Sequence, residues 1–470
     1  MKLRIPQFFK SFALRALTQS LAATLMPVHL LSQTNVAPPA RHIIICVDGV
    51  GISTINKMRD EGRFKKFQPP SRMISAFPSL TNAAISEILE PAGAKMSAGY
   101  EDNYFDIGGN RMRGGIFDRL RGGRFIRGTF RELFDYHPSA IKSGLGYVAP
   151  PVSTYLESLS DIIRLRQKAK QSSQPVFFAY SGATDSLAHL GGEGLLRRFL
   201  KQLEESIEDI VRGSKVPVDV TVFSDHGNHF RKYRRVGLKN PLRQAGFNID
   251  ERIKDQKSVV FPQYGLVGAA ILFTSASNEQ RVASIVASVD GVDFVAFERN
   301  GVVSVVSHDG EATIEKRGAT YRYQAVRGDP LDLLPVVAKL RKSSGSGLGS
   351  VAANEFDGFI DDSDWFAATC DGVRPDALRR IFEGATQGVV NRANLIVNLK
   401  DGYYTGNAMM DFVANIHATH GNIGQEQSFG FVISTRRELP AYIRAEDLWA
   451  ALGAPRLARR EMGQQKRSTN

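Results

Sequence analysis

The feature that most constrains the fold is a short, unbroken apolar run, Ile43–Val47, which ends directly in Asp48. A half-buried strand alternates apolar and polar residues, whereas an unbroken run is typical of a strand buried on both faces, as in a parallel sheet. Two later segments repeat this pattern, Val176–Tyr180 and Val218–Phe223. The chain is therefore predicted to build a sheet that is covered on both sides.

Helical patterns separate these predicted strands, at residues 153–170 and 193–212. Strands that alternate with helices predict an α/β fold with a doubly wound, mostly parallel sheet flanked by helices. The pattern resumes at residues 393–399 and ends with residues 429–434. We therefore expect residues 41–240 and 346–455 to form one α/β core.

The segment between these two parts has a different pattern of predicted secondary structure. Short β-rich pieces occur at residues 269–274 and 301–307, and one helical pattern covers residues 277–289. We expect residues 241–345 to form a smaller α+β cap insertion. A Ser/Gly-rich stretch follows it, and residues 456–470 form a basic tail.

The N-terminal segment, residues 1–40, has basic residues, then a moderately apolar stretch, then a linker. This is the order of a secretory signal peptide, and it predicts export to the periplasm or secretion. Thr18 and Pro27 interrupt the apolar stretch, so an amphipathic or disordered extension of a cytoplasmic protein is the alternative. No later segment has the roughly 18 consecutive apolar residues of a membrane span, so no transmembrane span is expected.

The net charge of +12 favours anionic ligands such as phosphate esters, nucleic acid or an acidic membrane surface. Solvated Lys and Arg faces are the commoner explanation of such a charge. An Arg/Gly-rich segment at residues 111–127 is interpreted as an ordered loop near a functional site rather than an RNA-binding tract. Because no recognised nucleic-acid-binding motif occurs, no specific nucleic-acid partner is expected. The two cysteines exclude a disulfide framework and a cysteine-based zinc site.

Acidic residues follow the three predicted strands. Asp48, Asp185 and Asp225 each lie just past a strand, where the carboxyl ends of parallel strands form a ligand crevice. His189 lies four residues after Asp185, on the same face if a helix begins there, and His226 follows Asp225. Each piece alone is typical of a turn or a helix cap. Together they favour a site for zinc, manganese or iron.

Thr81 lies in the segment Phe77-Pro78-Ser79-Leu80-Thr81-Asn82, which follows a short predicted strand and precedes a helical pattern at residues 83–89. A hydroxyl at a helix N-terminus receives backbone N–H groups and the positive end of the helix dipole. Thr81 is therefore either a simple N-cap or a nucleophile whose alkoxide a metal stabilises.

Five motifs, taken in order, resemble the alkaline phosphatase superfamily, and most closely its type I phosphodiesterase/nucleotide pyrophosphatase group. They are Asp48-Gly49, Phe77-Pro78-x-x-Thr81-Asn82, Asp185-x-x-x-His189, Ser224-Asp225-His226-Gly227 and Thr419-His420-Gly421. The motifs span roughly residues 42–435. Their joint occurrence is specific, although each short motif is not.

The resemblance implies two divalent metal ions, usually zinc, with manganese or iron as alternatives. One ion would be held by Asp185, His189 and His420. The other would be held by Asp48, Asp225, His226 and the Thr81 oxygen. The resemblance also implies a covalent phosphothreonine on Thr81 and an asparagine that donates to a phosphate oxygen, for which Asn103 is the candidate. His417 and His229 are alternatives to His420.

Some features depart from the family's pattern. The Cys or Ser nucleophile motif of the sulfatase branch does not occur around Thr81, and the usual proline after the nucleophile is replaced by Asn82. The Thr81-Asn82 pair resembles the phosphonoacetate hydrolase branch. We expect a hydrolase of phosphodiester bonds in a small anionic phosphate ester. A phosphomonoesterase, a phosphonate hydrolase and a catalytically silent anion-binding relative are the alternatives.

Overall fold

The computed structural model describes residues 40–92, 96–114, 150–172, 174–344, 357–406 and 416–453. The signal-like segment up to residue 39, the Arg/Gly-rich segment beyond residue 114 and the basic tail lie outside the described residues. The expectations for those three segments stay predictions.

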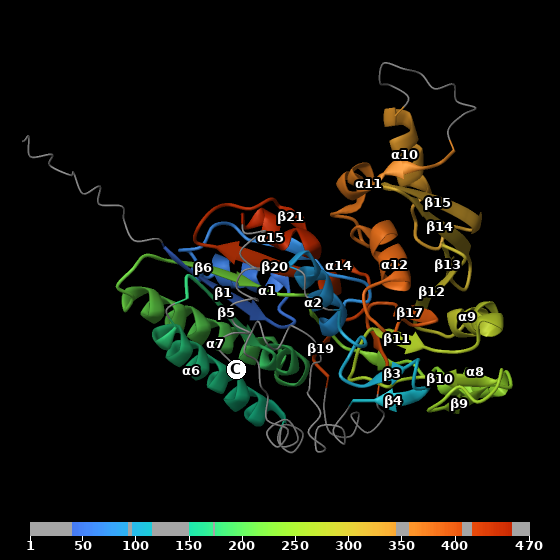
Figure 1. The fold of residues 1–470 in the computed structure, drawn as a ribbon, viewed down its shortest axis with the longest axis horizontal. Helices are drawn as coiled ribbons and strands as arrows, with labels where there is room; N and C mark the ends of the chain where they lie inside the picture. The colour runs from blue at the N-terminus through green and yellow to red at the C-terminus, as the bar shows by residue number, and fades with distance from the viewer. Residues whose placement is uncertain are drawn as a thin grey trace, which may run out of the picture. The chain divides into compact units, whose positions relative to one another are not determined.

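The first of two large sheets has six strands in the order β21-β2-β20-β6-β1-β5 (Figure 1). The strands are β1 (Arg41–Val47), β2 (Ser71–Ile74), β5 (Val176–Ser181), β6 (Val218–Phe223), β20 (Phe429–Ser434) and β21 (Tyr442–Arg444). β1 pairs in parallel with β5 and β6, and β2 pairs in parallel with β21. β20 is antiparallel to both β6 and β2, so the sheet is mixed around a parallel centre.

Helices cover both faces of this sheet, as the unbroken run in β1 predicts. Ile43 and Ile45 join a core cluster with α1 (Ile52–Asp60), α6 (Pro150–Gln171) and α7 (Ala183–Arg212). Ile44 and Cys46 point the other way, into a cluster with α2 (Thr81–Leu89) and α15 (Leu448–Ala451). Figure 1 shows α6 and α7 side by side along one face of the sheet.

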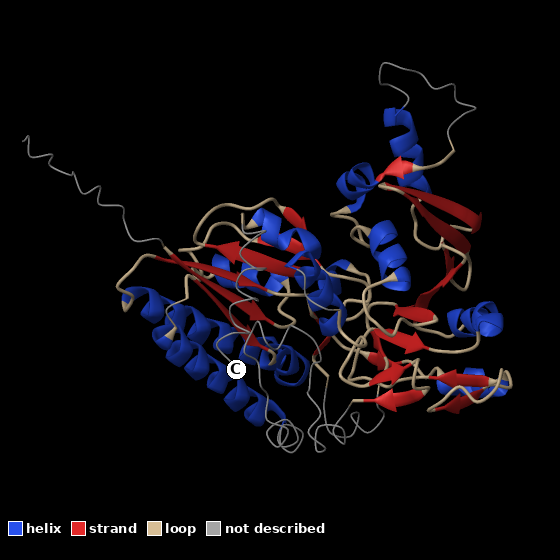
Figure 2. Cartoon of the chain, in the orientation of Figure 1, coloured by secondary structure: helices blue, strands red, loops and turns tan. Residues whose placement is uncertain are grey.

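The second sheet has seven antiparallel strands in the order β11-β17-β12-β13-β14-β15-β16. Figure 2 draws the strands of the chain in red. The strands are β11 (Ala269–Leu272), β12 (Val292–Arg299), β13 (Val302–Val306), β14 (Glu311–Arg317), β15 (Thr320–Arg327), β16 (Ile360–Asp361) and β17 (Leu395–Leu399). The helix predicted at residues 277–289 is observed as η2 (Ala276–Asn278) followed by α9 (Glu279–Ala287).

The strand pairing differs from the expected division at residues 345 and 346. β17 was expected in the α/β core, but it lies between β11 and β12 in the second sheet, and β16 completes the other edge. An unbroken apolar run shows only that a strand is buried on both faces. It does not say which strands are its neighbours, so the sequence pattern could not assign β17 to a sheet.

The second sheet packs directly against the segment that leads to Thr81. Phe77 and Leu80 belong to the same buried cluster as Phe294 of β12, and the rings of Phe77 and Phe294 lie 5.8 Å apart. Helix α12 (Ala377–Thr386) contributes Ile381 to this cluster. The packing of the second sheet therefore helps to position the start of α2.

Shorter elements complete the described chain. They are η1 (Glu90–Ala92), β3 (Tyr104–Asp106), β4 (Arg111–Arg113), β7 (His229–Phe230), β8 (Arg234–Arg235), α8 (Lys239–Gln244), β9 (Asn248–Asp250), β10 (Ser258–Val260), α10 (Leu334–Ser344), α11 (Asp362–Thr369), β18 (Tyr403–Tyr404), β19 (Ala418–Thr419), α14 (Gln425–Ser428) and η3 (Ala445–Asp447). Within the described ranges, no helix has the length and apolar character needed to cross a membrane.

Candidate metal centre

The carboxyl ends of three neighbouring parallel strands carry the acidic residues that the sequence predicts. Asp48 directly follows β1, Asp225 follows β6, and Asp185 lies in the first turn of α7, after β5. Because β5, β1 and β6 are adjacent and parallel, these three residues reach the same edge of the sheet. The crevice expected from the three apolar runs is therefore present.

One group of three potential metal ligands forms around Asp185. Helix α7 begins at Ala183, so His189 lies one turn after Asp185 on the same face, and its Nε2 is 3.3 Å from Asp185 Oδ1. His420 follows β19, and its Nε2 is 3.6 Å from the same oxygen. One ligand atom from each of these three residues lies within 4.8 Å of the others.

A second group consists of Asp48, Asp225 and His226, all of them buried. His226 Nε2 lies 3.3 Å from Asp48 Oδ1 and 3.6 Å from Asp225 Oδ2. The two groups are neighbours, because the rings of His226 and His420 stack with their centroids 4.0 Å apart. The structure thus brings together the six protein side chains that the resemblance divides between two ions.

Thr81 lies at the second group. It is the first residue of α2 and Leu80 is the N-cap, so the interpretation of Thr81 as the N-cap is wrong. Its Oγ1 is 3.3 Å from Asp48 Oδ1 and 3.3 Å from His226 Nε2. A hydroxyl at this position faces the ligand group, while the first backbone N–H groups of α2 have no partner within the helix.

Hydrogen bonds from the outer ring nitrogens fix two of the histidines. Nδ1 of His420 is 2.7 Å from the backbone oxygen of Ser79, and Nδ1 of His226 is 3.0 Å from the backbone oxygen of Gly227. A carbonyl oxygen can only accept, so each Nδ1 carries the proton and donates. When the ring is neutral, as metal ligation requires, each Nε2 then has a lone pair directed into the site.

Sequence reasoning missed several residues that hold the carboxylates. The Tyr180 hydroxyl donates to Asp48 Oδ2, and Asn228 Nδ2 donates to Asp185 Oδ1 at 2.8 Å. The Gly49 N–H donates to Asp225 Oδ1 at 3.2 Å. Gly49 has φ 64°, and a side chain there would collide with the Asp185 carboxylate. The Asp48-Gly49 pair was the available signal for that close approach.

The electrostatics of the second group fit a bound cation. Burial raises the pKa of Asp225, and the neighbouring Asp48 carboxylate raises it further. Oδ2 of Asp225 is buried and has no hydrogen-bond partner in the described part of the chain. Burial lowers the pKa of His226, but Asp225 and Asp48 outweigh it and raise that pKa to about 10. A divalent cation would relieve this crowding of negative charge, and carboxylate with imidazole is a donor set that zinc accepts.

In the first group, the pKa shifts favour an ionised aspartate beside a neutral histidine. Burial opposes the negative charge of Asp185, but His189 and His420 outweigh it, so the Asp185 pKa is lowered. Burial and the neighbouring His226 lower the pKa of His420 to about 3. An aspartate that stays ionised beside a histidine that stays neutral is the protonation state that metal ligation needs.

The side chains of the remaining predicted residues make no contact with either ligand group among the described residues. The His417 side chain is exposed, and only its backbone N–H contacts the site, by donating to the His189 carbonyl at 2.9 Å. His229 Nδ1 lies 2.9 Å from Asp401 Oδ2. Asn103 is half-buried just before β3, and the contacts of the described residues do not join its side chain to either group.

Glu101 is the acidic residue near the site that sequence reasoning did not select. Burial raises the pKa of Glu101 well above its usual range, and the charges of Asp185 and Asp48 raise it further. The Glu101 carboxyl group therefore lies close enough to both ligand groups to feel their charge. It stands two residues before Asn103, in the segment from which Asn103 was selected.

Comparison with solved structures finds proteins of similar fold. Phosphonoacetate hydrolase from Sinorhizobium meliloti 1021, in complex with phosphonoformate, aligns over 89% of this chain and 96% of that chain, with 12% identity and a TM-score of 0.49. Human ectonucleotide pyrophosphatase/phosphodiesterase 5 aligns over 88% of this chain and 93% of that chain, with 9% identity and a TM-score of 0.45.

No protein-family model matches the chain, and no curated protein matches it. The likeness to the two solved structures is one of fold. The chemistry is therefore inferred from this chain's own residues.

Proposed function

We propose that this chain is a metal-dependent phosphohydrolase of the alkaline phosphatase superfamily, with Thr81 as the nucleophile and a small phosphodiester as the substrate. The observation that carries the proposal is the position of the Thr81 hydroxyl, 3.3 Å from both Asp48 Oδ1 and His226 Nε2. A second group of potential ligands stands beside it.

Asp185, His189 and His420 would hold one divalent ion, and Asp48, Asp225 and His226, with the Thr81 oxygen, would hold the other. Zinc is proposed, with manganese or iron as alternatives. When bound, the two ions would stabilise negative charge on the attacking and leaving oxygens of an in-line displacement.

The proposed reaction has two steps. In the first step the Thr81 hydroxyl loses its proton and its oxygen forms a bond to phosphorus. The bond from phosphorus to the leaving oxygen breaks, and that oxygen leaves as an alcohol after taking up a proton. In the second step a water oxygen bonds to phosphorus, and the bond to Thr81 breaks. Thr81 takes up a proton released by that water, and a phosphomonoester is released.

The start of α2 suits the phosphoryl group that Thr81 would carry. Thr81 is the first residue of this nine-residue helix, so the free backbone N–H groups and the positive end of the helix dipole lie next to its oxygen. Asn103 is proposed to donate a hydrogen bond to a non-bridging phosphate oxygen.

The charge of the site supports a diester rather than a monoester. With two divalent ions bound and Thr81 still protonated, the carboxylates of Asp48, Asp185 and Asp225 leave a net charge of +1, which the single negative charge of a diester balances. A monoester brings a second negative charge, which this net charge does not balance.

The first test compares hydrolysis of bis-p-nitrophenyl phosphate with that of p-nitrophenyl phosphate, on the full chain, before and after chelation and after zinc is added back. We expect activity that chelation removes and zinc restores, with a higher kcat/KM for the diester. A higher kcat/KM for the monoester would make the protein a phosphatase. Activity toward a carbon–phosphorus bond alone would make it a phosphonate hydrolase, and metal binding without hydrolysis would make it an anion-binding relative.

A further inference from the structure

Two loops meet beside the candidate metal centre. The nucleophile loop, residues 75–80, leads to Thr81, and the ligand loop, residues 421–428, follows His420. The Ser79 N–H donates to the Gly421 carbonyl at 3.1 Å, and the Ser79 hydroxyl donates to the Asn422 carbonyl at 3.1 Å. The His420 ring in turn donates to the Ser79 carbonyl at 2.7 Å. The nucleophile and one ligand of the first group are therefore connected through Ser79.

The guanidinium of Arg380, from α12, bridges these two loops. Its side chain is buried, and Nη2 donates to the Ala76 carbonyl at 3.1 Å and to Ser79 Oγ at 3.1 Å in the nucleophile loop. The same nitrogen donates to Ser428 Oγ at 2.8 Å in the ligand loop. Nη1 adds a bond to the Ile423 carbonyl at 3.3 Å, also in the ligand loop.

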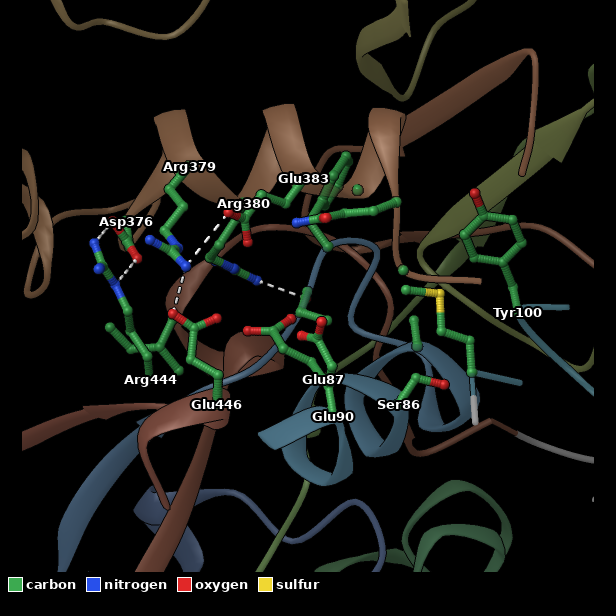
Figure 3. A pocket seen from close by; sticks show the side chains of 18 residues that line it. Ser86, Glu87, Glu90, Tyr100, Asp376, Arg379, Arg380, Glu383, Arg444 and Glu446 are labelled. Carbon is green, nitrogen blue, oxygen red and sulfur yellow. Dashed lines mark hydrogen bonds and ion pairs between the residues drawn. The ribbon is translucent and has the colours of Figure 1, made fainter. Parts of the chain in front are cut away.

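The acceptors of Arg380 are uncharged, which separates it from its neighbour on α12. Arg379 contacts the carboxylates of Asp362, Glu446 and Glu383. Figure 3 shows Arg379 and Arg380 extending from α12, with the Arg379–Glu446 contact beside Arg380. Burial lowers the pKa of Arg380 to about 10, although Asp376 and Glu87 oppose the shift. Hydrogen bonds from its guanidinium to uncharged acceptors, rather than a salt bridge, therefore hold Arg380 in place.

We infer that Arg380 is a positioning residue, which sets the Thr81 hydroxyl at its working distance from the ligand group that contains His420. This inference rests on the proposed function, because it assigns Arg380 to the same reaction. A planar guanidinium presents several N–H groups in fixed directions, so one side chain can hold two loops in register. Small displacements of reacting groups reduce turnover strongly, even when their cause lies outside the site.

The test is Arg380→Lys in the full chain. Lysine keeps the charge, but its side chain is one bond shorter and has one nitrogen. It therefore loses the Nη1 bond to the Ile423 carbonyl and cannot place its ammonium where Nη2 meets both loops. We expect kcat for bis-p-nitrophenyl phosphate to fall by about 10–100-fold, the range for groups that support metal ligands, with a smaller change in KM. In a zinc titration by calorimetry, one of two zinc equivalents should bind about 10–100-fold more weakly, and the other should be unchanged.

Arg379→Lys is the matched control, since it makes the same change on the same helix beside the same pocket. Its thermal unfolding should show any general loss of stability, while kcat and both zinc affinities stay at their wild-type values. Ser428→Ala is the second variant, and it tests the same inference if Arg380→Lys does not fold. It removes one acceptor of Arg380 without changing the charge, and should lower kcat and weaken the same zinc equivalent by a few-fold, near the effect of a single hydrogen bond.

The outcomes separate this inference from the proposed function. If the wild-type chain binds no zinc, the proposed function fails and the inference fails with it. If the wild type binds two equivalents, but a folded Arg380→Lys or Ser428→Ala has unchanged kcat and unchanged affinities, only the inference is overturned. A matching loss in Arg379→Lys would also overturn it, because the effect would then belong to α12 as a whole.

Discussion

The hydroxyl of Thr81 lies 3.3 Å from Nε2 of His226, at the start of α2. This contact places an oxygen nucleophile at a group of buried ligands, so the side chain can be tested directly. We expect Thr81→Ala to lower kcat by roughly 10⁴-fold or more, which is typical of nucleophile removal, while most of the zinc stays bound. Thr81→Ser keeps the oxygen and should retain activity. Steady-state kinetics and zinc content check both, and wild-type turnover in Thr81→Ala would remove Thr81 from the mechanism.

Asp225 is fully buried, and it is the carboxylate whose loss should empty one metal site. We expect Asp225→Asn to reduce the zinc content of the purified chain from two equivalents to one and to abolish turnover, because an amide is a weaker ligand and carries no charge. Asp219→Asn, on the strand β6 that Asp225 follows and beside Arg436, is the matched control and should keep both equivalents. Two tightly bound zinc ions in Asp225→Asn would show that the ligand set is wrong.

Tyr180 supports Asp48 and is not itself one of the proposed metal ligands. Its hydroxyl donates to Asp48 Oδ2, so Tyr180→Phe should weaken zinc binding at that group by about 10-fold or more, as removal of a supporting hydrogen bond does. Activity should recover when zinc is raised, because the ligands themselves are intact. Tyr155→Phe loses a hydroxyl bonded to Gln202 between α6 and α7 and should leave the zinc dependence unchanged. Equal zinc dependence in both variants would contradict a supporting role for Tyr180.

Much of the site could be predicted because the ends of buried strands can be recognised in the sequence. Asp48, Asp185 and Asp225 follow apolar runs, and adjacent parallel strands bring such residues to one edge. His420 follows no such run and was selected only through the motif resemblance. The contact between Arg380 and Ser79 joins residues 301 positions apart, and no local pattern encodes such a pair.

The fold, like the site, could be predicted only in part from the sequence. The burial of β1 on both faces could be predicted, since Ile43–Val47 is a continuous apolar run. The antiparallel insertion of β20 between β6 and β2 could not, because strand direction depends on the path of the chain between strands. The membership of β17 in the second sheet depends on the same path.

His42 gives a prediction about stability that is independent of turnover. Its ring is buried on β1, with Nε2 2.8 Å from Thr221 Oγ1. Burial, and then Arg436, lower its pKa from 6.5 to about 4. Between those two pH values the unfolded chain binds a proton that the folded chain does not, so lowering the pH through this window favours unfolding. At roughly 1.4 kcal/mol for each pKa unit, the loss attributable to His42 reaches about 3 kcal/mol.

His42→Gln isolates this contribution, because glutamine can keep a hydrogen bond to Thr221 and does not titrate. Denaturant unfolding of both proteins from pH 7.5 to pH 4.5, under identical conditions, gives the difference in free energy of unfolding between wild type and variant. Groups that titrate equally in both proteins, including the proposed metal ligands, cancel in that difference. We expect the difference in free energy of unfolding to be constant above about pH 7. As the pH falls below the ordinary histidine pKa of about 6.5, the wild type should lose stability relative to the variant. A difference that does not change with pH would mean that His42 takes up its proton in the folded chain as readily as in the unfolded one.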